Sequence, residues 1–389
     1  MHCDRVIWNN RDAVQLVNEK VRLIHLTGGG HIADFSLVST NAPSSVNPFW
    51  TPQWKSMEPY DYDASRDEAT YGPPLTGKTL CGLAGHSICL DLFGTPSTEE
   101  ALCGASIHGE AGISSWKCQC SAATAECTAE FSVSLPAAAL RLLRVLSLRA
   151  GESVIRIREI VENRRLIDRS FQWQQHATLG TPFLSADDCR ISLPGARGIT
   201  FPSGYEGKEL LASSSEFRWP FAPDLRGSLV DLRLTLLKKG SGFVAGIQFD
   251  PTRQYAFVCA VNARFHLAIG YCFKRADFPW ITLWEENLCR NDPPWNGNEQ
   301  ARGLEFGASP LPLSRKETLL AGPLFDTPAM AYVPARSKRA ANYVLFLTTV
   351  CPGFRDISDL RVEPDSLLLI GDDGTEQTIA AQGVGDFLA

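Results

Sequence analysis

The sequence has no long hydrophobic run. Its longest unbroken apolar stretch, residues 255–261, is seven residues long, whereas a membrane-spanning helix needs about 20. The first residues include Asp4, Arg5 and Arg11, and a secretory signal would be basic and then apolar at this place. We therefore expect a cytoplasmic protein that does not associate with membranes.

Blocks of one charge and paired cysteine motifs are also missing. The net charge is −6, from 37 Lys and Arg against 43 Asp and Glu, and no long basic block occurs, which argues against nucleic-acid binding. The 12 cysteines contain no Cys-x-x-Cys pair. Cys118, Cys120 and Cys127 come nearest to a metal pattern, but alternate residues of a strand share a face by simple packing. We expect free thiols and no metal ion.

Helical patterns are scarce, and strand patterns dominate. With 44% hydrophobic and 21% charged residues, the composition is that of an ordinary globular chain. The clearest hairpin joins residues 142–148 to 154–161 through Ala150, Gly151 and Glu152. Helical candidates are few and short, such as 11–18 and 97–102. Further strands are expected at 21–26, 131–135, 229–237, 242–249, 255–261, 265–273, 343–350 and 367–370.

This order of elements predicts an all-β fold. A regular alternation of strand and helix, which a doubly wound sheet requires, does not occur. The Pro-rich segments at 47–59, 292–297 and 310–312 also carry Trp, Phe or Leu, so they are expected to be ordered loops, not flexible linkers. We expect a single domain over residues 1–389, built as a large two-sheet antiparallel β-sandwich with few short helices.

Residues 72–79 read GPPLTGKT and match the P-loop pattern of nucleotide-binding proteins. A P-loop requires a buried strand before it and a helix after it, so that backbone amides converge on phosphates. Here residues 61–71 are too polar for a central strand. Pro73 and Pro74 have no backbone N–H, so two of the amide donors that would bind phosphates are also missing. We therefore interpret the match as accidental.

Three of the seven histidines lie in segments that suggest chemistry: His86, His108 and His176. Glycines stand beside His86 and His108, and a glycine lets a ligand or a backbone come close. The alternative for each is a histidine whose ring is satisfied by a neighbouring carbonyl.

Several segments together resemble the aldose 1-epimerase (galactose mutarotase) superfamily. They are the hairpin with EIVEN at 159–163, the strand that carries His176 and closes with GTPFL at 180–184, the IHG segment at 107–109 and the ARGLEFG segment at 301–307. The order and spacing agree over residues 21–312. The resemblance implies a mutarotase-type β-sandwich and an enzyme, an isomerase that interconverts sugar anomers. It also implies a small-molecule carbohydrate as partner, with no cofactor.

By this resemblance, Glu305 is the base and His176 the acid. One removes the proton of the anomeric hydroxyl and the other protonates the ring oxygen, so that the ring opens and recloses on the other face. His108 would bind the substrate or share the acid role. General acid-base help of this kind is worth about 10²- to 10⁴-fold in rate. We expect the ends of His176 and Glu305 to converge across one cleft, about a sugar ring apart.

A sugar also needs apolar rings for its C–H faces and polar groups for its hydroxyls. The candidates for substrate binding are His86, Lys55, Trp284, Glu285 and Arg302. Trp50, Trp54, Trp280 and Trp295 are further aromatic candidates, and each tryptophan has the alternative role of anchoring a loop.

The chain also departs from the family pattern. Ser106-Ile107 precedes His108 where the family has Asn-Arg, and His176 stands between Gln175 and Ala177 where the family has Asn and Ser. Two alternatives therefore stay open: a carbohydrate-binding protein without catalysis on the same fold, and a carbohydrate lyase or hydrolase that uses the same cleft. A lyase would place a tyrosine base, such as Tyr205 or Tyr271, over the cleft.

Overall fold

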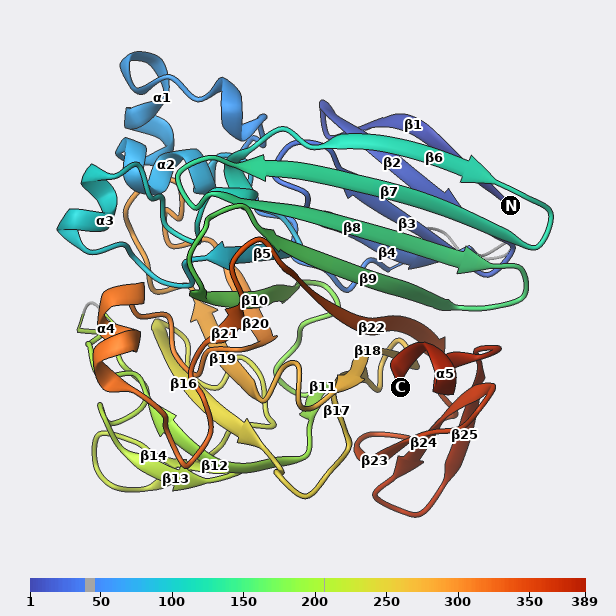
Figure 1. Cartoon of the computed structure of the whole chain (residues 1–389). Coiled ribbons are helices and arrows are strands. Elements are labelled where there is room, and N and C mark those ends of the chain that lie inside the picture. Colours follow the sequence, from blue (N-terminus) through green and yellow to red (C-terminus); the bar gives the residue numbers. More distant parts are fainter. Residues whose placement is uncertain (39–45, 206) are drawn as a thin grey trace.

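The computed structural model describes residues 1–38, 46–205 and 207–389. In this part of the chain, the strands form two large antiparallel sheets and one small sheet (Figure 1). The main apolar core includes Phe35 and Phe306 from the first sheet and Phe131 and Leu146 from the second. The all-β sandwich predicted from the sequence is thus confirmed.

The first sheet contains the strands that carry the candidate site. Its order is β1 (His2–Trp8), β2 (Arg11–Val17), β3 (Val21–Leu26), β4 (Ile32–Leu37), β5 (His86–Asp91), β10 (Arg169–Gly180), β20 (Gln300–Gly307), β19 (Trp280–Asn287), β16 (Ser241–Phe249), β12 (Gly195–Thr200), β13 (Glu216–Arg218), β14 (Phe221–Pro223) and β15 (Leu229–Asp231). The short β21 (Ala331–Val333) also pairs with β10.

The second sheet covers one face of the first. Its order is β11 (Cys189–Ser192), β17 (Tyr255–Asn262), β18 (Leu267–Lys274), β22 (Lys338–Thr349), β9 (Val154–Asn163), β8 (Leu140–Arg149), β7 (Glu126–Leu135) and β6 (Lys117–Ala122). The short helices are η1 (Pro59–Asp61), α1 (Ala64–Tyr71), α2 (Pro74–Leu80), α3 (Thr98–Leu102), η2 (Ala111–Ile113), α4 (Arg315–Ala321) and α5 (Val384–Leu388).

The small third sheet was not expected as a separate layer. It consists of β23 (Ile357–Val362), β24 (Ser366–Gly371) and β25 (Glu376–Ala380). Leu367 and Leu369 of β24 belong to one apolar cluster with Val154 and Phe257, which point out of the second sheet. The C-terminal part of the chain therefore covers the outer side of the second sheet. That residues 1–389 form a single domain stays a prediction.

Local predictions succeed where a turn or a cap fixes the structure. The predicted hairpin at Gly151 joins β8 to β9 in antiparallel register. The helix expected at 97–102 is α3, and Ser97 and Glu100 form a capping box at its start. The helix expected at 11–18 is wrong, because β2 is a strand paired on one side with β1 and on the other with β3. Of the strand expected at 229–237, only Leu229–Asp231 forms.

The interpretation of residues 72–79 as an accidental match is confirmed. The element before them is the helix α1, where a P-loop would need a buried strand, and Lys78 lies inside α2.

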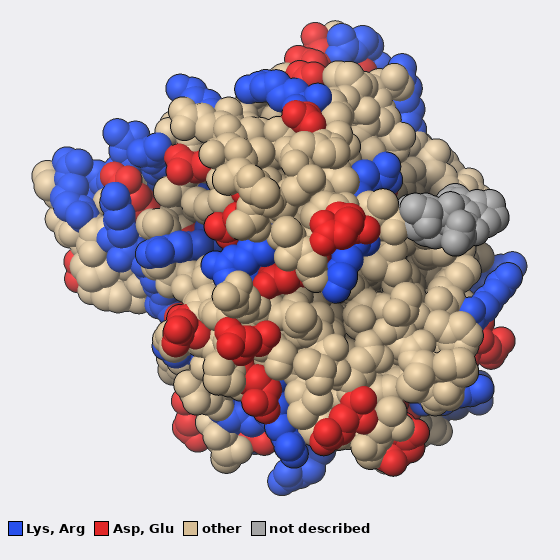
Figure 2. Space-filling view, turned by 90° about the vertical axis from the view of Figure 1, so that its right-hand side faces the viewer, with Lys and Arg blue, Asp and Glu red and all other residues tan. Residues whose placement is uncertain are grey.

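Among the described residues, no helix is long and apolar enough to cross a bilayer. On the face shown in Figure 2, acidic and basic side chains are interspersed.

A buried carboxylate connects the two sheets. Glu159 of β9 is fully buried and forms an ion pair of 2.7 Å with the equally buried Arg144 of β8. Its oxygens also accept hydrogen bonds from Trp173 Nε1 at 2.8 Å and Gln175 Nε2 at 2.7 Å, both on β10, and from the Tyr343 hydroxyl at 3.0 Å. This cluster fixes the position of β10 against the second sheet.

We predict that Glu159→Gln destabilises the fold by about 3–5 kcal/mol, because Arg144 is left as a buried charge without its partner. Urea unfolding followed by circular dichroism measures this. The control is Glu130→Gln on the exposed side of β7, for which a change within about 0.5 kcal/mol is expected. Equal effects of the two substitutions would contradict the role of the buried pair.

Candidate active site

The strand register brings His176 and Glu305 together. His176 of β10 lies directly opposite Glu305 of β20, and residues in direct register on one face of an antiparallel pair have adjacent side chains. His176 Nε2 lies 3.3 Å from Glu305 Oε1. The two groups therefore converge as expected, but they are in contact with each other and not separated by the width of a sugar ring.

Both groups lie on the face of the first sheet that points away from the second sheet. Neighbours along a strand point to opposite faces. Trp173 and Gln175 reach Glu159 between the sheets, so His176 points the other way. The pair is nearly enclosed, since His176 is 5% exposed and Glu305 is 3% exposed.

Burial controls the protonation of the pair. It lowers the pKa of His176 well below the ordinary value, and the positive charge that His108 would carry lowers it further. Burial also raises the pKa of the Glu305 carboxyl well above its ordinary value. Both shifts disfavour the charged forms, so at neutral pH the pair is expected to hold one proton between its two groups. The second ring nitrogen of His176, Nδ1, lies 3.1 Å from the Thr178 hydroxyl.

His108 is the third member of the site. Its ring centroid lies 5.1 Å from that of His176. His108 Nδ1 lies 2.5 Å from the carbonyl oxygen of Phe93. A carbonyl only accepts, so Nδ1 carries the hydrogen and Nε2 keeps its lone pair for a ligand. Burial, with a contribution from Arg290, lowers the pKa of His108 to about 4, and the ring is therefore neutral at pH 7.

The segment of β20 around Glu305 leaves space for the carboxylate. A Cβ added at Gly303 would lie 2.3 Å from Glu305 Oε1 and 3.2 Å from the Cβ of Trp284. Any side chain at this position would displace the carboxylate or the indole. The absence of a side chain at Gly303, in the ARGLEFG segment, therefore leaves room for the Glu305 carboxylate two residues later.

Four tryptophans pack against one another beside the pair. The Trp284 ring lies 6.0 Å from the His176 ring, and Trp50, Trp54 and Trp295 continue the cluster with ring centroids 5.3 to 6.2 Å apart. The tryptophans come from the loop before α1, from β19 and from the loop between β19 and β20, so their proximity depends on the tertiary structure.

The cluster also contains an arginine that sequence reasoning missed. The Arg290 guanidinium carbon lies 4.6 Å from the Trp295 ring centroid and 4.8 Å from that of Tyr205. Its Nε lies 3.6 Å from a carboxylate oxygen of Glu286. The only signal in the sequence was its place in the connection between two strands with candidate residues, Trp284 on one and Glu305 on the other.

The structure does not bring His86 to this site. His86 lies on the inner face of the first sheet and is fully buried. Its Nε2 lies 3.0 Å from Gln175 Oε1 and its Nδ1 lies 2.9 Å from the Tyr271 hydroxyl. Burial lowers its pKa to about 3, so it is a neutral part of the polar cluster between the sheets.

Glu285 and Arg302 also lie on the inner face. They are opposite each other on β19 and β20 and form a buried ion pair of 3.0 Å. The Glu285 carboxylate accepts hydrogen bonds from the backbone of Leu236 and Leu237 at 2.8 and 3.0 Å. Since Arg302 is three residues before Glu305, an odd separation, it cannot share the face of Glu305 on a regular strand.

The remaining candidates have other surroundings. Lys55 is exposed beyond Trp54. Trp280 is buried and donates a hydrogen bond of 2.7 Å to the Pro328 carbonyl, as a structural anchor does. In the ranges that the structure describes, no group of three or more His, Cys, Asp or Glu side chains is arranged to hold a metal ion.

The two tyrosines that a lyase would use are both engaged elsewhere. Tyr271 lies between the sheets with His86. The Tyr205 hydroxyl accepts a hydrogen bond from Trp284 at 2.7 Å and donates one to Glu286 at 2.9 Å. Burial raises the pKa of Tyr205 well above its ordinary value, which does not favour a role as a base.

Comparison with solved structures identifies the architecture. No family model matches the sequence, and no curated protein matches it. A provisionally assigned aldose 1-epimerase of Klebsiella pneumoniae superposes with a TM-score of 0.60 at 14% identity, over 88% of this chain and 80% of the other. A galactose mutarotase-like protein of Clostridium acetobutylicum gives 0.58 at 12% identity, over 90% and 99%.

The chain has the galactose mutarotase-like fold. A third protein with this fold, from Lactobacillus casei, gives a TM-score of 0.52 at 13% identity, over 86% of this chain and all of the other. The resemblance drawn from the sequence segments is thus confirmed for the fold. At such low identity, the function has to be argued from the site itself.

We predict that His108→Asn raises the pKa of His176, because it removes the first of the three histidines whose charge disfavours the imidazolium. Asparagine tolerates the left-handed backbone at this position, where φ is 63°. The pKa should stay below 6.5, since burial is the larger cause. NMR titration of the ring nitrogens measures the pKa of His176 in the parent and in His108→Asn. The exposed His266→Asn variant is the control. A parent His176 that titrates at or above 6.5 would contradict the burial argument.

Proposed function

We propose that this protein is a carbohydrate epimerase of the aldose 1-epimerase type. The observation that carries the proposal is the 3.3 Å contact between His176 and Glu305, with His108 beside them. An imidazole and a carboxyl in contact can exchange protons with two neighbouring oxygens of one substrate, and a cyclic sugar has such oxygens on its anomeric carbon.

The reaction follows from the proton shared by the pair. In the neutral pair the shared proton lies on Glu305. Its transfer to His176 across the 3.3 Å contact gives a carboxylate and an imidazolium. The Glu305 carboxylate then takes the proton of the anomeric hydroxyl while the His176 imidazolium protonates the ring oxygen. The bond between the anomeric carbon and the ring oxygen breaks, and an open-chain aldehyde forms. After rotation of the aldehyde group, the reverse transfers close the ring on the other face. The pair holds one proton before and after each step, so no external acid or base is consumed.

Two neighbouring groups support this role. His108 Nε2, with its lone pair available, can accept a hydrogen bond from a sugar hydroxyl. Trp284 offers an apolar ring beside His176 for a C–H face of the sugar. Because His176 and Glu305 touch, a substrate has to separate them as it enters.

The enclosure of the pair favours a second candidate, a carbohydrate-binding protein without turnover. At 5% and 3% exposure, neither group is open to a sugar in this conformation. The two candidates differ in one measurable quantity, which is the rate of anomer interconversion.

Polarimetry of freshly dissolved sugars is the experiment that tests the enzyme. We predict that His176→Asn and Glu305→Gln each lower the catalysed rate by about 10²- to 10⁴-fold, because each removes one proton-transfer group. His266→Asn, in the turn between β17 and β18, and Glu130→Gln, on β7, change exposed positions and should keep the parent rate. If both site variants, correctly folded, match the parent, the proposed roles are wrong. If the parent itself gives no acceleration with any sugar, binding without turnover replaces the enzyme.

The catalysed rate should also show a broad pH plateau. Below the lowered pKa of His176 the pair takes up a second proton, and above the raised pKa of Glu305 it loses its only one. The one-proton form therefore persists over a wider range than the ordinary values of 6.5 and 4.5 would allow. Rates corrected for the buffer reaction measure this. An optimum confined between pH 4.5 and 6.5 would contradict it.

A further inference from the structure

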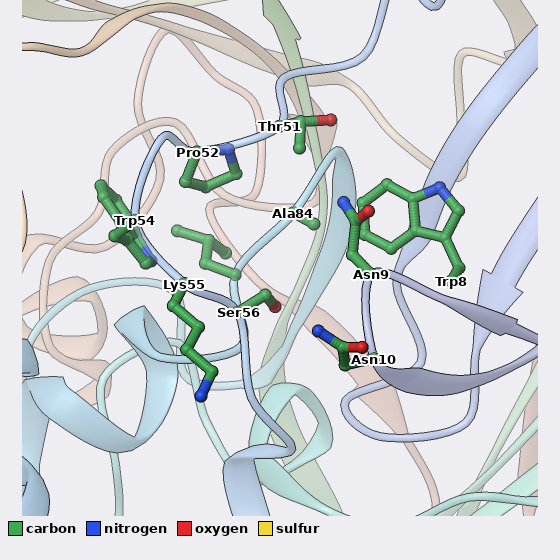
Figure 3. Close-up of a pocket in the computed structure, with 10 residues that line it drawn as sticks. Trp8, Asn9, Asn10, Thr51, Pro52, Trp54, Lys55, Ser56 and Ala84 are labelled. Carbon is green, nitrogen blue, oxygen red and sulfur yellow. The ribbon is translucent and has the colours of Figure 1, made fainter.

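A separate pocket of about 200 Å³ opens beside the tryptophan cluster. Figure 3 shows Trp8 on one side of it and Trp54 on the other, with Asn9 and Asn10 beside Trp8. The rest of its lining is Thr51, Pro52, Lys55, Ser56, Leu83 and Ala84. Neither His176 nor Glu305 lines this pocket.

The tryptophan cluster forms a wall between the pocket and the candidate active site. Trp54 contributes to the pocket and packs edge-on against Trp50 and Trp295. Trp284, on the other side of the cluster, packs against His176. A ligand in the pocket would thus lie next to the proposed active site without touching the proton-transfer groups.

We propose that this pocket binds a saccharide unit, at a site distinct from the one at His176 and Glu305. This inference goes beyond the proposed function, because binding in the pocket does not require anomer interconversion. Where both hold, the two sites together would accommodate adjacent units of one glycan.

The size and chemistry of the lining carry the proposal. Pockets for drug-sized ligands measure about 300–1,000 Å³, so about 200 Å³ suits one small ring and not a nucleotide. Two indoles offer flat apolar faces for C–H groups, while amides and hydroxyls match the hydroxyls of a sugar. The lining contains no carboxylate, and Lys55 is its one charged residue.

The polar and aromatic groups are held by the fold. Asn9 and Asn10 form the two-residue turn between β1 and β2, and both have positive φ, 46° and 63°. Such a turn is favoured in a hairpin because its backbone twist matches that of the flanking strands. Trp54 Nε1 donates a hydrogen bond of 2.9 Å to the Leu80 carbonyl, and Trp8 packs on the apolar cluster around Ile24. The pocket is therefore formed before a ligand binds, which limits the ordering cost of binding.

The test follows the indole N–H signals of nitrogen-labelled protein by NMR, with maltose and D-glucuronate as probes at millimolar concentrations. Trp8→Phe and Trp54→Phe assign the two signals. We expect both to shift and saturate with at least one probe, while the signal of the buried Trp280 stays in place. If neither Trp8 nor Trp54 responds to either probe, the proposal is overturned.

Substitutions then locate the binding. Asn10→Gly keeps the turn, because glycine also adopts positive φ, and removes one amide. It should weaken binding by about 2- to 12-fold, the range for one lost hydrogen bond. Lys55→Met should weaken D-glucuronate more than maltose, because only D-glucuronate is anionic. Unchanged affinities in Asn10→Gly would overturn the proposal.

The His176→Asn variant separates this proposal from the proposed function. If the pocket binds independently, the shift of the Trp8 signal stays at the parent affinity in this variant. If the shift disappears with His176, the saccharide binds at the proton-transfer pair and the pocket proposal is wrong. A parent without any anomer interconversion would remove the proposed enzyme, while a saturable Trp8 response would still support the pocket.

Discussion

The arrangement of this protein depends on a carboxylate buried between two sheets. The side chains of Glu159 and Arg144 have no contact with solvent. The cost of removing their charges from water is therefore compensated by the ion pair and by the polar groups around it. Two of those groups, Trp173 and Gln175, belong to β10 of the opposite sheet. Because a slip of one residue would exchange the two faces of a strand, these bonds determine which side chains of β10 point away from the core. His176 is one of them.

Because side chains alternate between the two faces of a strand, the first sheet carries polar groups with different roles on its two faces. On the inner face, His86 and the pair of Glu285 with Arg302 have their polar atoms engaged with protein partners, so they serve the fold. On the outer face, the His176 and Glu305 side chains contact each other and are almost completely shielded from solvent. Burial lowers the pKa of the first and raises that of the second, and a pair that shares one proton is the arrangement that acid-base exchange with a sugar requires.

The fold and the site carry different weight in the functional argument. The galactose mutarotase-like architecture is shared with proteins at 10–14% identity, which reflects a common sandwich and does not transfer an activity. The proposed reaction depends on the contact between His176 and Glu305. The aromatic wall next to it, with Arg290 over its rings, gives this chain a pocket on the far side that the reaction itself does not need.

The sequence by itself determined the strand-rich class, the hairpin at Gly151 and the short helix at 97–102, because these patterns are local. It also indicated His176, Glu305 and His108 through a resemblance of short segments. Only the tertiary structure decided which face each candidate occupies. His86, Glu285 and Arg302 point into the sandwich, because strand pairing and long-range burial fix the register. The same pairing brings residues 176 and 305 into contact, and no local pattern in the chain encodes that distance.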